Sequence, residues 1–497
     1  MERFVRLLVV IVSGVLSLSG VGIAQEQGLS EATIERIRAE FQMDAGTRAM
    51  RNALTGTDIR EIAENRQIVA GHNDKFSHKI KTKGISNQKS SGRCWMFAGF
   101  NTIKPILMDK LEIDSFEFSQ IYLQFWDKME KANAFLQTMI DFRDRDLMYR
   151  EVVFLLKSPC PYGGYWENFV DLVAKHGVMP KEAMAETASS ESTGMMNRIL
   201  ARILRKDAVE LRDIYEATGS VKQMELGKER MLKEVYRVLV LNLGEPPTQF
   251  SWRHKIKDKK ADEDEEAEDE DAPAEAEDAD EKEEDAKDEY EVQQKWSERR
   301  IFTPKSFYDE FVGVDLRQYV NLTNDPVRPR GGHYEIQLTR SLYGGQNANY
   351  VTVSIETLKE IVTKVLLDNR AVYFAADVSP DQDSKKGIMA RDLYDYESIY
   401  GIGMDLSKTE RILFRDSTIN HGMAFIGVDL QEGRPVKWLV ENSWGSDRGD
   451  GGLWTMYDDW FEDNVYNVIV HSDYVPREVM ALFAQPATKL PVWDPMW

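Results

Sequence analysis

Cysteine is scarce in this chain, and that scarcity limits how the fold can be stabilised. Only two of the 497 residues, Cys94 and Cys160, are cysteines, so a scaffold built on several disulfides is excluded. A single Cys94–Cys160 disulfide stays open, although Cys160 lies between Pro159 and Pro161 in a loop of its own, which favours two free thiols. Stability must therefore come from an apolar core, and the 42% of hydrophobic residues are sufficient to build one.

Long hydrophobic runs are also absent after the first two dozen residues. At the start, Arg3 and Arg6 precede an apolar stretch at residues 7–18, and the small residues Gly22 and Ala24 follow. This pattern is typical of an export signal, and we expect cleavage after Ala24 and a periplasmic or extracellular protein. An uncleaved anchor is the alternative, because the apolar region is nearly long enough to span a bilayer. A membrane contact is expected only in that second case.

The chain lacks an excess of positive charge, since its formal net charge is -21. This argues against non-specific binding to nucleic acids. Residues 262–291 carry 20 Asp and Glu against two Lys, so the rest of the chain carries only about -3. A segment with so many like charges cannot form a compact structure, and we predict a disordered acidic loop over 257–295. This loop is expected to extend from a hairpin whose two arms are residues 250–252 and the region near Trp296. Its spacing does not match a calcium loop, and no metal is expected.

A glycine- and serine-rich stretch at 84–98 places Cys94 in what we predict to be the first turn of a helix. Unpaired backbone N–H groups and the helix dipole there stabilise a thiolate. Gln88, six residues earlier, could direct its side-chain NH₂ to the same place and, with the N–H of Cys94, hold an oxyanion. The alternative is that Cys94 is a buried small hydrophobic residue, as cysteines commonly are.

A second cluster lies near the C-terminus, where His421 precedes an apolar strand and residues 436–442 form another. Neighbouring strands pair as a hairpin, which would bring Asn442 close to His421. The amide would orient the imidazole while its other nitrogen faces a thiol, as in a nucleophile–base–orienter set. Trp444 could cover the His–Asn hydrogen bond and exclude water. The alternative for His421 alone is a structural histidine.

The remaining pattern predicts both helices and strands. Helices are expected over 30–64 with Ser30 as N-cap, and over 116–126, 167–176, 197–243 and 355–368; strands are expected at 334–338, 350–355 and 371–378. The prolines and glycines at 159–166 predict a loop. Gly163 and Gly164 would let the backbone approach a ligand closely, and a plain tight turn is the alternative.

Three motifs together carry a resemblance to a known family. Residues 88–95 (Gln-Lys-Ser-Ser-Gly-Arg-Cys-Trp), Asn420-His421 and residues 441–445 (Glu-Asn-Ser-Trp-Gly) resemble the papain-like cysteine peptidases, and more narrowly the bleomycin hydrolase / aminopeptidase C branch. Further matches lie at 163–166, 321–326 and 490–496. The resemblance implies an α+β fold, with a papain-like core made of a helical half and an antiparallel β half, a large helical insertion and the disordered acidic loop.

The family resemblance also implies a function, a thiol peptidase that trims N-terminal residues of peptides and forms a homohexamer, without a cofactor. By this resemblance, Cys94 is the nucleophile and His421 acts as base and acid. Asn442 orients His421, and Gln88 donates a hydrogen bond to the oxyanion. Gly163, Gly164, Trp444 and Trp497 are the expected substrate-binding residues.

The same resemblance predicts how the chain is divided into segments. We expect a signal at 1–24, a helical extension at 25–74, the helical half at 75–196, a helical oligomerisation insertion at 197–256, the acidic loop at 257–295, the β half at 296–480 and a C-terminal arm at 481–497.

Two departures leave other functions open. The family's C-terminal arm places its carboxylate against the substrate's ammonium group, whereas this chain stops at Trp497, a few residues earlier, so endopeptidase or dipeptide-releasing action is an alternative. The export signal and acidic loop are unlike the cytoplasmic members, and nucleic-acid binding should not be transferred. A silent peptide-binding or cage-forming homologue and a transglutaminase-like acyl transferase are the remaining alternatives.

Overall fold

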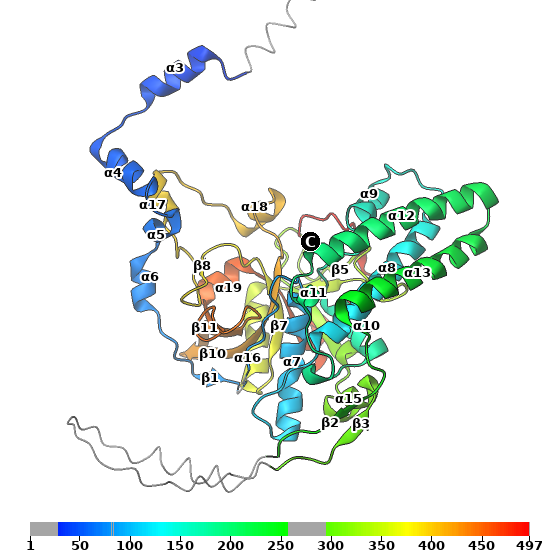
Figure 1. The fold of residues 1–497 in the computed structure, drawn as a ribbon. Helices are drawn as coiled ribbons and strands as arrows, with labels where there is room; N and C mark the ends of the chain where they lie inside the picture. Colours follow the sequence, from blue (N-terminus) through cyan, green and yellow to red (C-terminus); the bar gives the residue numbers. More distant parts are fainter. Residues whose placement is uncertain (1–27, 81, 83, 257–294, 497) are drawn as a thin grey trace, which may run out of the picture. The chain divides into compact units, whose positions relative to one another are not determined.

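The structure is a computed structural model that describes residues 28–80, 82, 84–256 and 295–496 (Figure 1). The expected signal, nearly all of the expected acidic loop, and Trp497 lie outside the described residues. The described residues divide into two compact units: those up to Arg66 with Tyr394–Met404, and those of 67–393 and 405–497.

The smaller unit is helical, and its breaks follow from capping residues. It contains α3 (Glu31–Glu40), α4 (Ala45–Leu54), α5 (Ile59–Ala63) and α17 (Tyr396–Tyr400). Ser30 caps α3 by accepting the Thr33 N–H at 3.2 Å, as the sequence predicted. The single helical pattern expected over 30–64 is divided because Asp44 and Asp58 cap new helices in the same way.

The larger unit holds the other helices of the described residues, with α6 beginning at the last residue before this unit. They are α6 (Arg66–Gly71), α7 (Cys94–Leu111), α8 (Gln120–Asp141), α9 (Arg150–Lys157), α10 (Trp166–His176), η1 (Lys181–Ala183), α11 (Ala188–Glu191), α12 (Gly194–Thr218), α13 (Val221–Leu243), α15 (Pro304–Phe311), η2 (Leu316–Gln318), α16 (Ile355–Leu367), α18 (Lys408–Leu413), α19 (Asp458–Asn464), η3 (Ser472–Tyr474) and α20 (Arg477–Phe483). The long pattern expected over 197–243 is two helices, α12 and α13, which run side by side (Figure 1). Within the described residues, no helix has the length and apolar character needed to cross a membrane.

The strands form one large sheet and one small hairpin. They are β1 (His78–Lys79), β2 (Phe250–Trp252), β3 (Arg300–Phe302), β4 (Tyr319–Thr323), β5 (His333–Ile336), β6 (Asn349–Thr352), β7 (Val372–Ala376), β8 (Gln382–Asp383), β9 (Ile388–Met389), β10 (His421–Gln431), β11 (Arg434–Glu441), β12 (Leu453–Tyr457), β13 (Val465–His471) and β14 (Thr488–Leu490). The large sheet has the order β14-β5-β6-β4-β13-β7-β10-β11-β12-β9-β8, with β1 added on β10. The predicted hairpin at 250–252 is the antiparallel pair β2–β3.

The helix α7 and the strand β10 together position the site. Every residue of α7 from Trp95 to Pro105 is buried, which is expected of a helix that is largely apolar. It packs against β7 and β10, and β7 is buried at all five positions, as its apolar run predicted. The first residue of α7 is thereby fixed beside the first residue of β10.

Candidate active site

Cys94 begins α7 as predicted, and the loop before it has a fixed conformation. Gly92 has a φ of +66°, and a Cβ there would lie 2.4 Å from the Tyr162 ring, so glycine is required. Arg93 forms two hydrogen bonds to Glu186, at 2.9 and 2.8 Å, with its side chain 3% exposed. These contacts hold the cysteine at the helix start, where the residue as a whole is intermediate in exposure.

His421 and Asn442 meet across the β10–β11 hairpin. The two strands pair antiparallel, and His421 Nε2 lies 2.9 Å from Asn442 Oδ1. That Asn442 oxygen also accepts the Ser443 N–H at 2.7 Å, which identifies it as the acceptor. Nε2 must therefore donate, and the Nδ1 atom of His421 is left to face the thiol.

Cys94 and His421 both line one cavity, and each shifts the pKa of the other. Burial by itself raises the pKa of the Cys94 thiol, but the charge and hydrogen bond of His421 outweigh it and leave the pKa below its ordinary value. Burial lowers the pKa of His421, yet Cys94 and the Asn442 hydrogen bond raise it overall. Both shifts favour a thiolate–imidazolium pair.

Trp444 lies against the imidazole of His421. The two ring centroids are 4.8 Å apart at an interplanar angle of 31°, and Trp454 packs edge-on against Trp444 at 5.3 Å. Trp444 is not among the residues that line the cavity described below. The indole therefore packs against the imidazole that bonds Asn442, and a substrate contact of Trp444 stays a prediction.

Gln88 is tied to the residue that follows Asn442. Its backbone N–H donates to the Ser443 carbonyl at 2.8 Å, and the Ser443 hydroxyl donates to Gln88 Oε1 at 2.7 Å. Because Oε1 is occupied in this way, the amide is oriented and its Nε2 donor is directed away from Ser443. The Gln88 side chain is buried, at 8% exposure.

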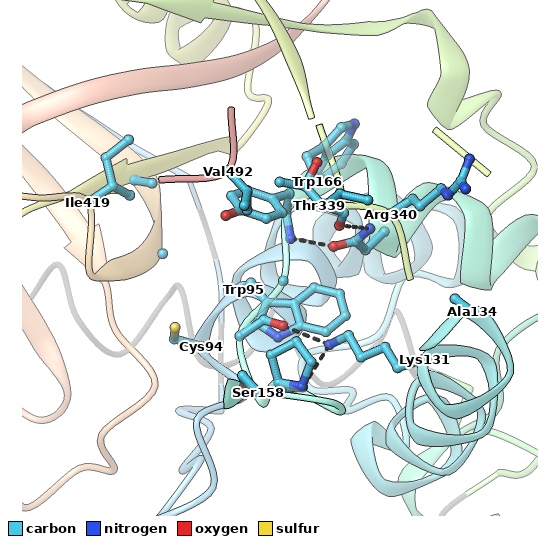
Figure 2. A pocket seen from close by; sticks show the side chains of 18 of the residues that line it. Cys94, Trp95, Lys131, Ala134, Ser158, Trp166, Thr339, Arg340, Ile419 and Val492 are labelled. Carbon is cyan, nitrogen blue, oxygen red and sulfur yellow. Dashed lines mark hydrogen bonds between the residues drawn. The ribbon is translucent and has the colours of Figure 1, made fainter. Parts of the chain in front are cut away.

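A cavity of about 300 Å³ adjoins the sulfur and the imidazole. Gly163 and Gly164 line it, as expected, and a Cβ on Gly164 would lie 2.6 Å from the Trp95 indole. Figure 2 shows the Cys94 sulfur on one side of that indole and Lys131 on the other. Lys131 Nζ holds the Gly163 carbonyl at 2.7 Å, which fixes the glycine segment along the cavity.

Some residues of the cavity were not found from the sequence. Tyr373 lines it from β7, and burial followed by the Cys94 charge raises the pKa of its phenol well above the ordinary value. Its strand was interpreted only as buried core. Lys131 lies in α8, whose sequence resembles that of an ordinary core helix. The one sequence feature that points to Lys131 is its i, i+4 spacing from Asp127, and the two side chains form an ion pair at 2.9 Å.

Cys160 is a second free thiol and not a disulfide partner of Cys94. It is 5% exposed, and burial raises the pKa of its thiol. The described residues contain no group of three or more His, Cys, Asp or Glu side chains arranged to hold a metal ion.

Comparisons with known proteins agree on one family. The model of the Peptidase C1-like family matches residues 28–272 and 283–497. Aminopeptidase C of Streptococcus thermophilus is 32% identical over 471 residues, covering 94% of this chain and 98% of the relative. Human bleomycin hydrolase is 33% identical over 482 residues, with the same coverage of each chain.

A solved structure is similar along the same length. The crystal structure of PepW from Lactobacillus rhamnosis HN001 superposes with a TM-score of 0.84 at 31% identity, covering 95% of this chain and 99% of the other. The expected α+β fold with a papain-like core is confirmed by this likeness. The chain belongs to the Peptidase C1-like family, as a papain-like cysteine peptidase of the aminopeptidase C and bleomycin hydrolase type.

Proposed function

We propose that the chain is an exported aminopeptidase in which Cys94, His421 and Asn442 form the catalytic triad. The observation that carries this proposal is the meeting of Cys94 and His421 at one cavity, with His421 hydrogen-bonded to Asn442, the pKa of the thiol lowered and that of the imidazole raised. A thiolate beside an imidazolium is the state from which a cysteine peptidase attacks.

The reaction follows from these positions. The Cys94 thiolate attacks the carbonyl carbon of the scissile peptide bond, and the oxyanion receives hydrogen bonds from Gln88 Nε2 and the Cys94 N–H. As the first residue of α7, Cys94 has no intrahelical acceptor for that N–H. His421 gives its proton to the leaving amine and then deprotonates the water that hydrolyses the acyl-enzyme.

Restriction to the first residue of a peptide requires a group that binds its ammonium. Within the described residues, no Asp or Glu lines the cavity. The C-terminal arm does reach it: β14 pairs with β5, Val492 lines the cavity, and Met496 is fully buried. In line with the family resemblance, we therefore assign ammonium binding to the C-terminal arm.

The arm is held in place by ion pairs, since Arg328 bonds both Asp494 and Asp325.

Because the arm lies beside the cavity, removing the residues after Leu490 should increase cleavage of N-terminally blocked peptides. Equal rates for intact and truncated protein would mean that the arm does not restrict the cleft, and would favour endopeptidase or dipeptide-releasing action.

The activity is tested by comparing free and blocked aminoacyl-coumarin substrates. The wild type should hydrolyse the free-amine form, and Cys94→Ala should abolish this hydrolysis. Unchanged turnover by that variant would refute the proposal, and a wild type that binds peptides without cleaving them would indicate a silent homologue.

Export and assembly rest on the sequence. We propose cleavage after Ala24 and a homo-oligomer, in line with the signal pattern and the family resemblance. The N-terminal residue of the purified protein and its molecular mass in solution test these two proposals.

A further inference from the structure

A buried lysine lies at the junction of the three segments that carry the expected triad and oxyanion groups. Lys104 is in α7, ten residues after Cys94, and its ammonium lies 2.6 Å from Glu441 Oε1 and 3.1 Å from the Gly84 carbonyl. Glu441 directly precedes Asn442, and Gly84 begins the loop that leads to Gln88. One ammonium group therefore joins the nucleophile helix, the strand of the orienting amide and the loop of the oxyanion donor.

The pair is withdrawn from water almost completely. The side chains of Lys104 and Glu441 are 4% and 0% exposed, and Glu441 Oε2 has no hydrogen-bond partner. The desolvation free energy of two buried charges can exceed the energy of their attraction. An apolar pair of the same size often stabilises a fold equally well. Stability alone is therefore a weak reason for this pair.

Its geometry suits a different purpose, the register between α7 and β11. The backbone of Glu441 is fixed between Ala424 of β10 and Leu453 of β12, so its carboxylate is a rigid point of attachment. At 1.5 Å per residue, Lys104 lies roughly 15 Å along the helix from Cys94 and does not touch the reacting atoms. Any effect on catalysis must pass through the position of α7 relative to Asn442.

We propose that Lys104 and Glu441 are positioning residues that hold the Cys94 helix in register with the His421–Asn442 hairpin. The inference builds on the proposed function, because it assigns the register on which the attacking thiolate depends. Without the pair, α7 can shift along the sheet, and Cys94 moves away from His421. The thiolate is then less stabilised, while the cavity that receives the substrate keeps its lining.

The test uses a double variant, Lys104→Met with Glu441→Met, and the conservative variant Lys104→Arg. The pH midpoint of Cys94 alkylation by iodoacetamide is measured by mass spectrometry on the Cys94 peptide, which separates it from Cys160. We expect the double variant to unfold at the wild-type temperature or above, with a higher alkylation midpoint. Its kcat should fall roughly 100-fold, as for a small displacement of reacting groups, while KM changes little. Lys104→Arg should retain wild-type values.

A matched control is Lys359→Met, which removes the ion pairs of Lys359 with Asp458 and Glu462, both at 2.6 Å, between α16 and α19. It should lower the unfolding temperature and leave the Cys94 midpoint unchanged. A stable double variant with wild-type midpoint and kcat would overturn the proposal. Because alkylation needs no substrate, a shifted midpoint in a protein that cleaves no peptide would uphold the positioning role and refute the proposed function instead.

Discussion

Asn442→Ala is the substitution that tests the site most directly. In the wild type, the Asn442 amide oxygen accepts hydrogen bonds from His421 Nε2 at 2.9 Å and from the Ser443 N–H at 2.7 Å. The variant removes the first of these, while Cys94 and the cavity lining stay intact. The imidazole then loses its fixed orientation, and the imidazolium loses a hydrogen-bond acceptor.

The size of the effect follows from that lost hydrogen bond. A hydrogen bond to a charged group contributes about 1.5–3 kcal/mol, so kcat should fall about 10- to 150-fold. The Asn442 hydrogen bond also raises the pKa of His421. Without it, His421 loses its proton at a lower pH, and the alkaline limb of the kcat/KM profile should move to lower pH. The thiolate is then less stabilised, so the acid limb should move upward and the active pH range should narrow.

The measurement is the pH dependence of kcat and KM with an aminoacyl-coumarin substrate. Asn464→Ala is a suitable control, because Asn464 is buried at 3% exposure and bonds Arg411 instead of a triad member. It should reduce stability without moving either limb. If Asn442→Ala keeps its kcat within about twofold of the wild type and leaves the alkaline limb unmoved, then Asn442 does not orient His421.

Three further substitutions probe the surroundings of the triad. Gly164→Ala places a Cβ 2.6 Å from the Trp95 indole, so the glycine segment must shift, and KM should rise more than kcat falls. Ser443→Ala frees the Gln88 amide to rotate, and kcat should fall about tenfold with KM unchanged, which steady-state kinetics would show. Burial raises the pKa of Glu167 from 4.5 to about 7, so its contribution to stability is fully present below pH 4.5 and is lost as pH rises to about 7. Glu167→Gln carries no such charge, and thermal unfolding at pH 8 should therefore show a variant more stable than the wild type.

The expected site could be found from the sequence because its residues stand at local signals. Cys94 follows a glycine turn that begins a helix, and His421 and Asn442 flank two consecutive strands, which usually pair. Those signals depend on short stretches of chain, and the structure has the helix and both strands where they were expected.

The two buried lysines near the site could not be found in this way, because their roles depend on contacts between distant segments. Lys131 reaches the Gly163 carbonyl across 32 positions of the chain, and Lys104 reaches Glu441 across 337. From the sequence of its own helix, each lysine would be placed at the surface or at the edge of the core, because burying a lysine without a partner is costly. Only the folded arrangement supplies those partners.

The activation of Cys94 shows the same division between local and distant causes. From the sequence, the helix start by itself accounts for a reactive thiolate. In the structure, burial works against the thiolate, and the charge of His421 is the foremost of the causes that lower the pKa, ahead of the backbone N–H groups of Gly422 and Trp95. Cys160 is the internal comparison: it is also buried, and the nearby charges of Lys128 and Lys131 do not prevent burial from raising its pKa. The nearby lysine charges are therefore insufficient to lower the pKa of the buried Cys160 thiol, whereas the charge of His421 lowers that of Cys94 in spite of burial.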